Sequence, residues 1–276
     1  MVQWCKKYIS LGGLLALLFV LAACSVPGLG GTSPTPTQTL QNSAAAMAKL
    51  NSVHVDLQAT LNARANNANG GVTFNLSGHG DAAKPDNASV SLSLGQKHLL
   101  AVISAGSKVY VQPSNGVWYW LDKSTLKNAA QTFFSQSLAT RLGQIMTVVE
   151  NAKLTDQGQE TLNGVSLDHI NAVLDQQTLQ ALNTQLSGLL PQGVQTGQSQ
   201  ITAASLDLWI DQSTWFVHQA VLNVTTQVDM TALQPYIGQS DVTGVIPVTV
   251  KAQLNFSKFN QPINIQPPAN SVPFPQ

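Results

Sequence analysis

Charge is scarce in this sequence. Asp, Glu, Lys and Arg make up 9% of its 276 residues and cancel to a formal net charge of zero, whereas about a quarter is usual in a globular domain. Proteins that bind nucleic acid need clustered Lys and Arg to neutralise phosphates, so nucleic acid is not an expected partner. The composition also gives no reason to expect an anionic substrate or an electrostatic attachment to membranes.

Cysteine is rarer still. The only two are Cys5 and Cys24, and Cys5 falls in an N-terminal segment that we expect to be removed on export. A protein with a single cysteine cannot form an internal disulfide, even in an oxidising compartment. The stability of the mature protein is therefore expected to come from its hydrophobic core.

Motifs for catalysis and metal binding are missing too. None of the five histidines lies near another at the spacing of metal ligands. The sequence has no Gly-x-Ser-x-Gly elbow, His-Glu-x-x-His pair or phosphate-binding glycine loop. His79 and Asp81 are interpreted as a polar strand end. We expect no enzyme, no catalytic residue, no metal and no cofactor, and a hydrolase assembled from distant residues is the third hypothesis for function.

The chain begins with the three parts of an export signal. Lys6 and Lys7 form a basic region, residues 9–22 an apolar stretch, and "LAAC" (21–24) a small-residue end. The apolar run is shorter than the roughly 20 residues of a membrane-spanning helix, and Gly and Pro follow it in place of charges. An uncleaved anchor helix is the alternative interpretation.

The "LAAC" stretch resembles the lipobox of bacterial lipoproteins. The resemblance implies a signal peptide over residues 1–23 and a diacylglycerol group on Cys24, the first residue of the mature protein. It places the protein outside the cytoplasm, anchored to the bacterial cell membrane. Two or three acyl chains suffice for stable anchoring, because each buried methylene contributes roughly 0.8 kcal/mol. Residues 24–39, rich in Pro, Gly and Thr, are expected to form a tether, and residues 40–276 the folded domain.

Alternation of apolar and polar side chains dominates the rest of the chain. Val53, Val55 and Leu57, for example, alternate with His54 and Asp56, which is typical of a half-buried strand. Segments of this kind cover residues 52–63, 72–80, 88–95, 98–105, 108–113, 117–122, 153–174, 204–230 and 245–259. Several of them are separated by turn residues such as Ser114, Asn115 and Gly116.

Helical spacing appears in three places. Residues 40–50 are expected to form a short helix with Leu40, Ala44 and Met47 on one face. A longer apolar stripe runs over residues 124–149, and a further helix follows Asp175 as its N-cap.

These elements predict an α+β fold. We expect a single large, curved antiparallel sheet, a half-barrel of about ten strands, with helices packed on its concave face. Short connections favour antiparallel neighbours, and strands with one apolar face need a cover on one side only. Two small domains joined near residue 190 are the alternative.

The order of the elements resembles that of the LppX/LprAFG lipoproteins, which share a half-barrel fold with the LolA and LolB carriers and with the regulator RseB. The stretches that carry the resemblance are "LNSVHVDLQATL", "LNGVSLDHI", "LWIDQSTWFVHQAVL" and "LNFSKFNQPINIQPPA". The resemblance implies a curved sheet and helices that enclose an apolar cavity for acyl chains. It assigns no ligand-binding residue to this chain.

A physical argument also favours a cavity. A sheet of this size curls, and with aromatic residues at only 6% its inward side chains leave space beneath the helices. A normally packed core is the alternative. The helical residues expected to line the cavity are Phe133, Phe134, Leu138, Leu142, Ile145, Leu182 and Leu186.

The expected function is that of a membrane-anchored protein that binds a lipid, glycolipid or other hydrophobic ligand in this cavity and carries or transfers it without chemistry. The alternative is an envelope interaction or sensor module, similar to RseB, that binds a protein partner and holds no lipid.

Overall fold

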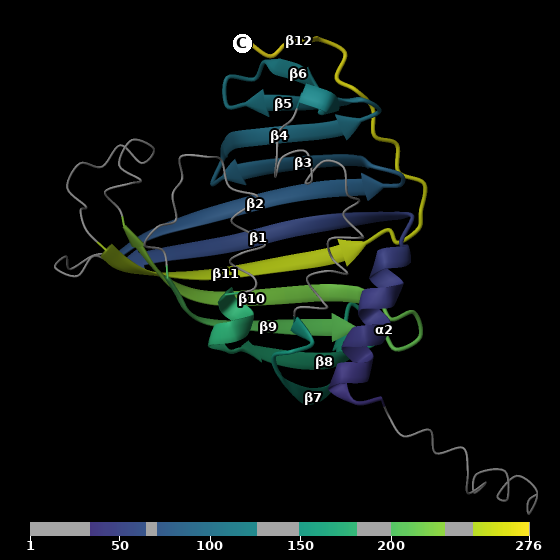
Figure 1. Ribbon diagram of the computed structural model, residues 1–276, viewed down its shortest axis with the longest axis vertical. Coiled ribbons are helices and arrows are strands. Elements are labelled where there is room, and N and C mark those ends of the chain that lie inside the picture. The colour runs from purple at the N-terminus through teal and green to yellow at the C-terminus, as the bar shows by residue number, and fades with distance from the viewer. Residues whose placement is uncertain (1–33, 65–70, 126–148, 181–199, 230–244, 276) are drawn as a thin grey trace, which may run out of the picture. The chain divides into compact units, whose positions relative to one another are not determined.

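The computed structural model describes residues 34–64, 71–125, 149–180, 200–229 and 245–275. These residues form one sheet of twelve strands in the order β12-β6-β5-β4-β3-β2-β1-β11-β10-β9-β8-β7 (Figure 1). The strands are β1 (Ser52–Arg64), β2 (Gly71–Ala83), β3 (Asn87–Leu94), β4 (Lys97–Ala105), β5 (Lys108–Pro113), β6 (Trp118–Asp122), β7 (Lys153–Leu162), β8 (Val165–Leu174), β9 (Gln200–Ile210), β10 (Val217–Asp229), β11 (Val245–Ser257) and β12 (Ser271–Pro273). The described residues also include helix α2 (Pro36–Lys49) and a short 3-10 helix, η1 (Lys123–Thr125).

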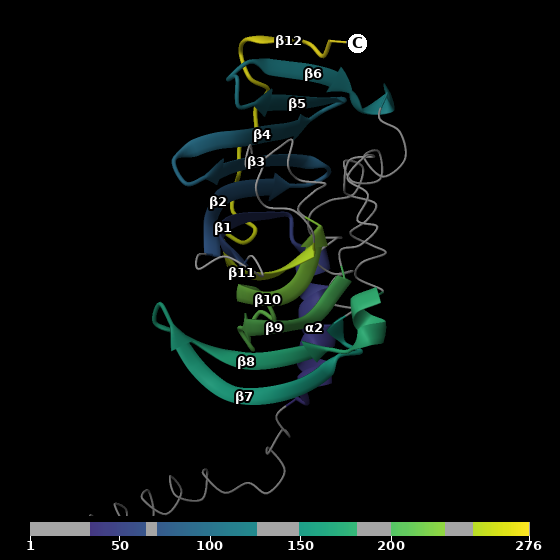
Figure 2. The same cartoon turned by 90° about the vertical axis from the view of Figure 1, so that its left-hand side faces the viewer.

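The sheet is curved and does not close. Neighbouring strands are antiparallel except β12 and β6, which run parallel. The edges are β12 and β7, and Figure 2 shows how strongly β7 and β8 bend. The prediction of an α+β fold built on a single curved antiparallel sheet is confirmed, with twelve strands in place of about ten.

Strands from the two ends of the chain lie side by side at the centre of the sheet. In the pairing of β1 with β11, His54 lies opposite Ser257 and Ala63 opposite Val248. Strands before and after residue 190 thus belong to one continuous sheet, and the alternative of two separate domains is wrong for the described residues.

β12 is a strand that the sequence pattern does not predict. The Pro-rich segment after β11 runs past the strand ends to the far edge of the sheet (Figure 1). There Ser271 to Pro273 pair with Trp118 to Trp120. Three residues are too few to show alternation, so the pairing arises only because the preceding segment brings them to the edge of β6.

Helix α2 begins earlier than expected. The Thr35 hydroxyl accepts a hydrogen bond from the Gln38 backbone N–H (3.3 Å), and the Gln38 side chain accepts one from the Thr35 N–H (2.9 Å). This capping box and Pro36 in the first turn define the helix start, so residues 36–39, predicted as the end of the tether, are helical. The predicted apolar face is confirmed, because Leu40, Ala44 and Met47 are buried.

The helix predicted after Asp175 also starts as expected. The Thr178 N–H donates to the Asp175 carboxylate at 2.8 Å, and this backbone hydrogen bond is the main cause that lowers the pKa of Asp175. The remainder of this helix lies outside the described residues, as does most of the stretch 124–149.

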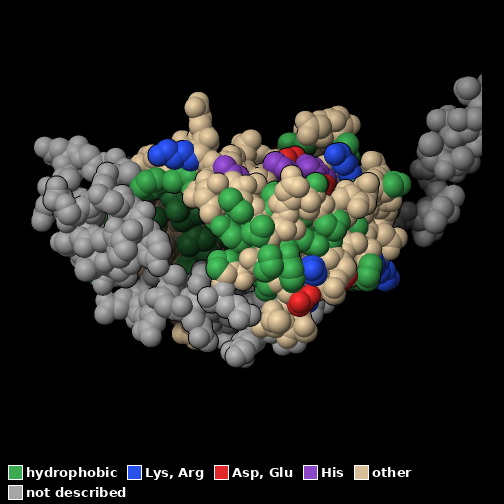
Figure 3. All heavy atoms as spheres, turned by 90° about the horizontal axis from the view of Figure 1, so that it is seen from above, with side chains coloured by type: hydrophobic (Ala, Val, Ile, Leu, Met, Phe, Trp, Pro, Cys, Tyr) green, Lys and Arg blue, Asp and Glu red, His purple; other side chains and the backbone are tan. Residues whose placement is uncertain are grey.

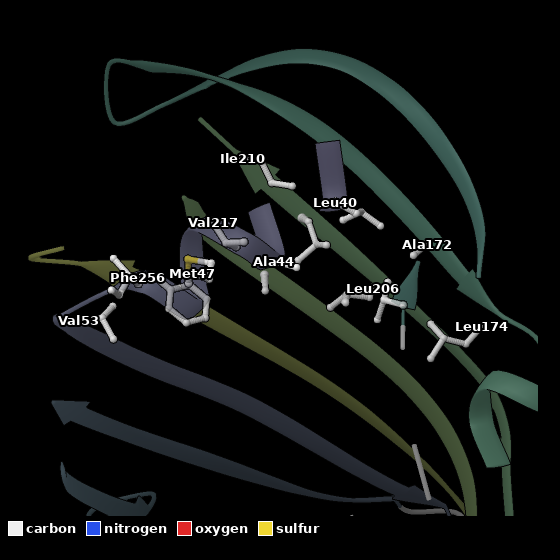
Figure 4. Close-up of a cluster of buried hydrophobic side chains, with 14 of the residues drawn as sticks. Leu40, Ala44, Met47, Val53, Ala172, Leu174, Leu206, Ile210, Val217 and Phe256 are labelled. Carbon is white, nitrogen blue, oxygen red and sulfur yellow. The ribbon is translucent and has the colours of Figure 1, made fainter. Parts of the chain in front are cut away.

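The buried core joins α2 to half of the sheet. In Figure 4, Leu40, Ala44 and Met47 of α2 face side chains such as Leu206, Val217 and Phe256. Each fully buried apolar side chain of this size stabilises the fold by about 1.5–3 kcal/mol. The cluster includes residues of α2, β8, β9, β10, β11 and β1, and reaches β2 only at Ala82. The described core is therefore concentrated on the β8–β11 side of the sheet.

Candidate functional site

One face of the sheet is apolar across nine strands. Residues that lie directly opposite each other on antiparallel strands share a face, so the pairing registers define rows of side chains. The central row consists of Ile170, Leu208, Ala220, Leu254, Leu57, Gly78, Leu92, Leu100 and Pro113. No member of this row has a polar side chain.

The flanking rows have the same character. One consists of Ala172, Leu206, Leu222, Ala252, Ala59, Leu76 and Leu94. The other consists of Phe256, Val55, Gly80, Val90, Val102, Val111 and Tyr119, and is apolar except for the Tyr119 hydroxyl.

The opposite face is polar along the same line, although Ile103, Tyr110 and Trp120 lie on it nearer the β6 edge. Its corresponding row consists of Asn171, Asp207, Val221, Gln253, Gln58, Ser77, Ser93 and His98. Val221 is the one apolar residue in it. The two faces therefore differ sharply, as the alternation in the sequence predicts.

Burial changes along the apolar rows. Ile170 and Leu208 are 2% exposed, and Leu208 belongs to the cluster beneath α2. Farther along, Leu92 and Leu100 are only partly buried and Val90 is 44% exposed. We call this second half the open apolar face; its side chains are Phe74, Leu76, Val90, Leu92, Leu94, Leu100, Val102, Val111, Tyr119 and Leu121.

The molecule is hollowed and apolar when seen along the sheet. Figure 3 shows hydrophobic side chains lining a depression in the surface. Gly78 leaves room on the open apolar face for the side chain of Leu92. A Cβ atom on Gly78 would lie 2.7 Å from both the Leu92 Cδ2 atom and the Ser91 carbonyl oxygen. Leu92 can lean over β2 only because that side chain is absent.

The predicted cavity residues cannot be placed. Phe133, Phe134, Leu138, Leu142 and Ile145 lie in 126–148, and Leu182 and Leu186 in 181–199, all outside the described residues. The sheet residues of the open apolar face were not predicted as ligand contacts. Their alternation in residues 72–80, 88–95 and 98–105 identified them as strands, but did not reveal that this part of the face lacks the burial found beneath α2.

Two histidines of the polar face each lie between two acidic side chains. His54 lies 2.7 Å from Asp81 and 3.3 Å from Asp56. Asp81 is thus paired with His54 and not with His79, which lies opposite Asp56. The arrangement is a local hydrogen-bonded cluster on a polar surface, in line with the interpretation of His79 and Asp81 as a polar strand end.

The second histidine, His169, lies 2.8 Å from Glu160 and 3.1 Å from Asp207, and its ring stacks on Trp209. Hydrogen bonds from Trp209 and then from His169 lower the pKa of Glu160. Within the part of the chain that the structure describes, no group of three or more His, Cys, Asp or Glu side chains is arranged to hold a metal ion.

A second concave feature lies beside α2. A groove of about 390 Å³ separates the outer side of α2 from the turn between β9 and β10. It is lined by Asn42, Ala45, Ala46, Lys49, Leu50, Trp215, Phe216 and Asn260. Phe216 also stacks on Phe259, with ring centroids 4.8 Å apart.

The turn beside this groove holds Trp215 in an unusual conformation. Its φ is +61°, a left-handed backbone that costs an L-residue about 1–2 kcal/mol and normally favours glycine or asparagine. The Trp215 N–H donates to the Asp211 carbonyl at 2.6 Å. Burial raises the pKa of Asp211, but hydrogen bonds from Ser213 and Thr214 outweigh it, and the pKa is lowered overall.

Comparison with known proteins gives matches in structure alone. No protein-family model and no curated protein sequence matches the chain. Among solved structures, it is similar to the Mycobacterium tuberculosis lipoprotein LppX (16% identity, TM-score 0.49, 85% of this chain and 100% of that one) and to LprF from Mycobacterium bovis (16%, 0.49, 86% and 100%). It is also similar to a LolA superfamily protein from Nitrosomonas europaea (11%, 0.25, 84% and 96%).

These are the groups named by the sequence resemblance. Because every TM-score is below 0.5, we argue the fold from the sheet topology and the function from this chain's own side chains. Within the described residues, no helix has the length and apolarity required to cross a bilayer.

Proposed function

We propose that this protein is a membrane-anchored lipoprotein that binds a lipid, glycolipid or other ligand with hydrocarbon chains on the open apolar face, and carries it without chemistry. One observation supports the proposal above all. The apolar rows that are buried beneath α2 continue, still apolar, across β2 to β5 with partly exposed side chains.

Hydrocarbon fits such a surface energetically. Each methylene group removed from water contributes about 0.8 kcal/mol, so ten of them contribute about 8 kcal/mol before the cost of ordering the chain. The side chains of the open apolar face carry no charge, and apolar concave surfaces of this kind accept apolar guests. Selection there depends on the shape and length of the hydrocarbon, while a polar headgroup stays in water.

The anchor is the second part of the proposal. Cys24, in the lipobox-like "LAAC", lies outside the described residues. We propose that it carries the acyl chains and holds the domain at the outer surface of the bacterial cell membrane, with residues 25–34 as the tether.

Native mass spectrometry of the protein purified from a lipid-synthesising bacterial host tests cargo binding. We expect a mass that exceeds the denatured mass by one or more lipids, because non-covalent lipid dissociates on denaturation while acyl groups on Cys24 stay attached. An identical native and denatured mass, together with no uptake of a fluorescent fatty-acyl probe, would contradict the proposal.

Adjacent residues on the two faces of β3 provide a matched control. Leu92→Asp places a charge on the open apolar face and is expected to abolish lipid uptake, whereas Ser91→Asp places it on the polar face and should leave uptake intact. Leu92→Trp, which adds apolar volume without charge, is expected to reduce uptake while preserving the fold. If the natural protein instead captured a protein partner, Leu92→Asp would abolish that capture and the native mass would be free of lipid.

A further inference from the structure

The sequence places a large aromatic residue where the backbone favours glycine. Trp215 follows the turn Asp211–Thr214 with φ +61°, and a hairpin alone would be served better by Gly at that position. Persisting left-handed backbone in a bulky residue is a recognised marker of functional positions. The Trp215 side chain lines the groove beside α2.

Two alanines line the groove where a helix surface is usually polar, next to the polar side chains of Asn42, Lys49 and Asn260. Ala45 is exposed and Ala46 partly exposed on the outer side of α2, and Leu50 and Phe216 complete the apolar lining. An indole and a phenyl ring at the rim of a shallow apolar groove match the side chains that proteins place at the boundary between water and lipid.

Three lysines gather at the same end of the sheet. Lys49 lines the groove, and the Lys84 Nζ donates to the Lys49 carbonyl at 3.0 Å. Lys258 precedes Phe259 and Asn260, of which Phe259 stacks on Phe216 and Asn260 lines the groove. All three lysines are exposed.

Within the described residues, none of these three lysines forms an ion pair with an acidic side chain. Among the described lysines, only Lys123 forms an ion pair, with Asp86 at 2.7 Å. The carboxylate of Asp211, in the turn next to the groove, accepts hydrogen bonds from Ser213 and Thr214, which favour its ionised form. Next to the groove, the three exposed lysines thus outnumber the single carboxylate of Asp211, although the whole chain is neutral.

We propose that this end, made of Lys49, Lys84, Lys258, Trp215 and Phe216, docks on an anionic phospholipid bilayer. The aromatic rings enter the interfacial layer and the lysines contact lipid phosphates. Docking is separate from cargo binding on the open apolar face. The predicted anchor permits it, because the eleven residues from Cys24 to Pro34 span at most about 40 Å when extended.

The test uses the intact protein reconstituted into vesicles of phosphatidylcholine and phosphatidylglycerol, seven to three, with brominated acyl chains that quench nearby tryptophan. We expect quenching that weakens in pure phosphatidylcholine and at high salt. Trp215→Gly suits the left-handed backbone but removes a ring that packs against the core, so the variant is first shown by circular dichroism to keep its fold; it should then remove the quenching. Trp209→Phe, on the polar face against His169, should leave it unchanged.

Charge is tested with two triple variants that lose the same net charge. Changing Lys49, Lys84 and Lys258 to Gln is expected to lower the ratio of docked to undocked protein on the order of 100-fold. The matched control changes the exposed residues Lys97, Lys153 and Lys251 to Gln and should leave the ratio within a few-fold of the natural protein.

Three results would overturn the proposal: quenching that persists in Trp215→Gly, equal quenching in pure phosphatidylcholine, or equal losses in the two triple variants. Capture of a protein in place of quenching would likewise overturn it. The lipid that co-purifies is measured on the same samples. Its presence in a variant that no longer docks, or its absence from a protein that does, separates failure of one proposal from failure of the other.

Discussion

Two leucines of the central apolar row differ in how deeply they are buried. Leu208 and Leu92 belong to the same row, yet Leu208 is 2% exposed beneath α2 and Leu92 is only partly buried. These two leucines therefore allow the packed core and the open apolar face to be compared with the same residue type.

That comparison gives a stability prediction. Leu208→Ala is expected to lower the free energy of unfolding by about 2–5 kcal/mol, because it removes buried methylenes and leaves a cavity, while Leu92→Ala should cost about 1 kcal/mol or less. Urea denaturation of the two variants, compared with the natural protein, measures both. Equal losses would show that the β3 side of the row is packed as tightly as the β9 side.

His218 makes stability depend on pH. Burial lowers the pKa of His218 below its ordinary 6.5, and the nearby Asp211 carboxylate only partly opposes this. The unfolded chain therefore binds the proton more readily than the folded one, and stability falls as pH drops below about 6.5. We expect His218→Gln to flatten the pH dependence of the unfolding midpoint between pH 7 and pH 5. The exposed His79→Gln serves as control, and an unchanged slope in the His218 variant would contradict the assignment.

At the scale of elements, α2 shows how a local signal decides a boundary. The capping box between Thr35 and Gln38 starts the helix within a Pro- and Thr-rich stretch. Its members are only three residues apart and can be read from the sequence, but the composition of the surrounding segment favours a tether. The buried face of the helix was predictable because its spacing is local.

The cap makes a measurable contribution. Thr35→Ala is expected to lower the free energy of unfolding by about 1 kcal/mol, since it leaves the Gln38 N–H without its side-chain acceptor. Thr37→Ala, at an exposed position of the first turn, is the matched control and should change stability by a few tenths of a kcal/mol. A loss in the control as large as that in Thr35→Ala would mean that the cap is not the cause.

At the scale of the whole molecule, the proposed location at the membrane depends on one cysteine, Cys24. We expect Cys24→Ser to remove the acylated form of the protein, so that it no longer incorporates radiolabelled palmitate. Cys5→Ser, in the segment predicted to be removed, should leave labelling and cleavage intact. Labelling that depends on Cys5, or that persists in Cys24→Ser, would refute the predicted lipidation site. Cargo binding is measured independently of this outcome.

The strands, their faces and the apolar surface of α2 were predictable because alternation and helical spacing are local properties of a few neighbouring residues. The sequence did not predict the register of β1 against β11 or the addition of β12 to β6, because each depends on segments far apart in the chain.

The two proposed surfaces were decided only by the tertiary structure. Overall neutrality gave no sign of a lysine cluster, because Lys49 ends α2, Lys84 follows β2 and Lys258 follows β11. The three residues lie at one end of the sheet because β2 and β11 both pair with β1, the strand that comes after α2. Likewise, the alternation within each strand predicts an apolar face. It does not predict which strands α2 packs against. Alternation is a property of neighbouring residues. The packing of α2 on the sheet and the clustering of the lysines arise from contacts between residues far apart in the chain.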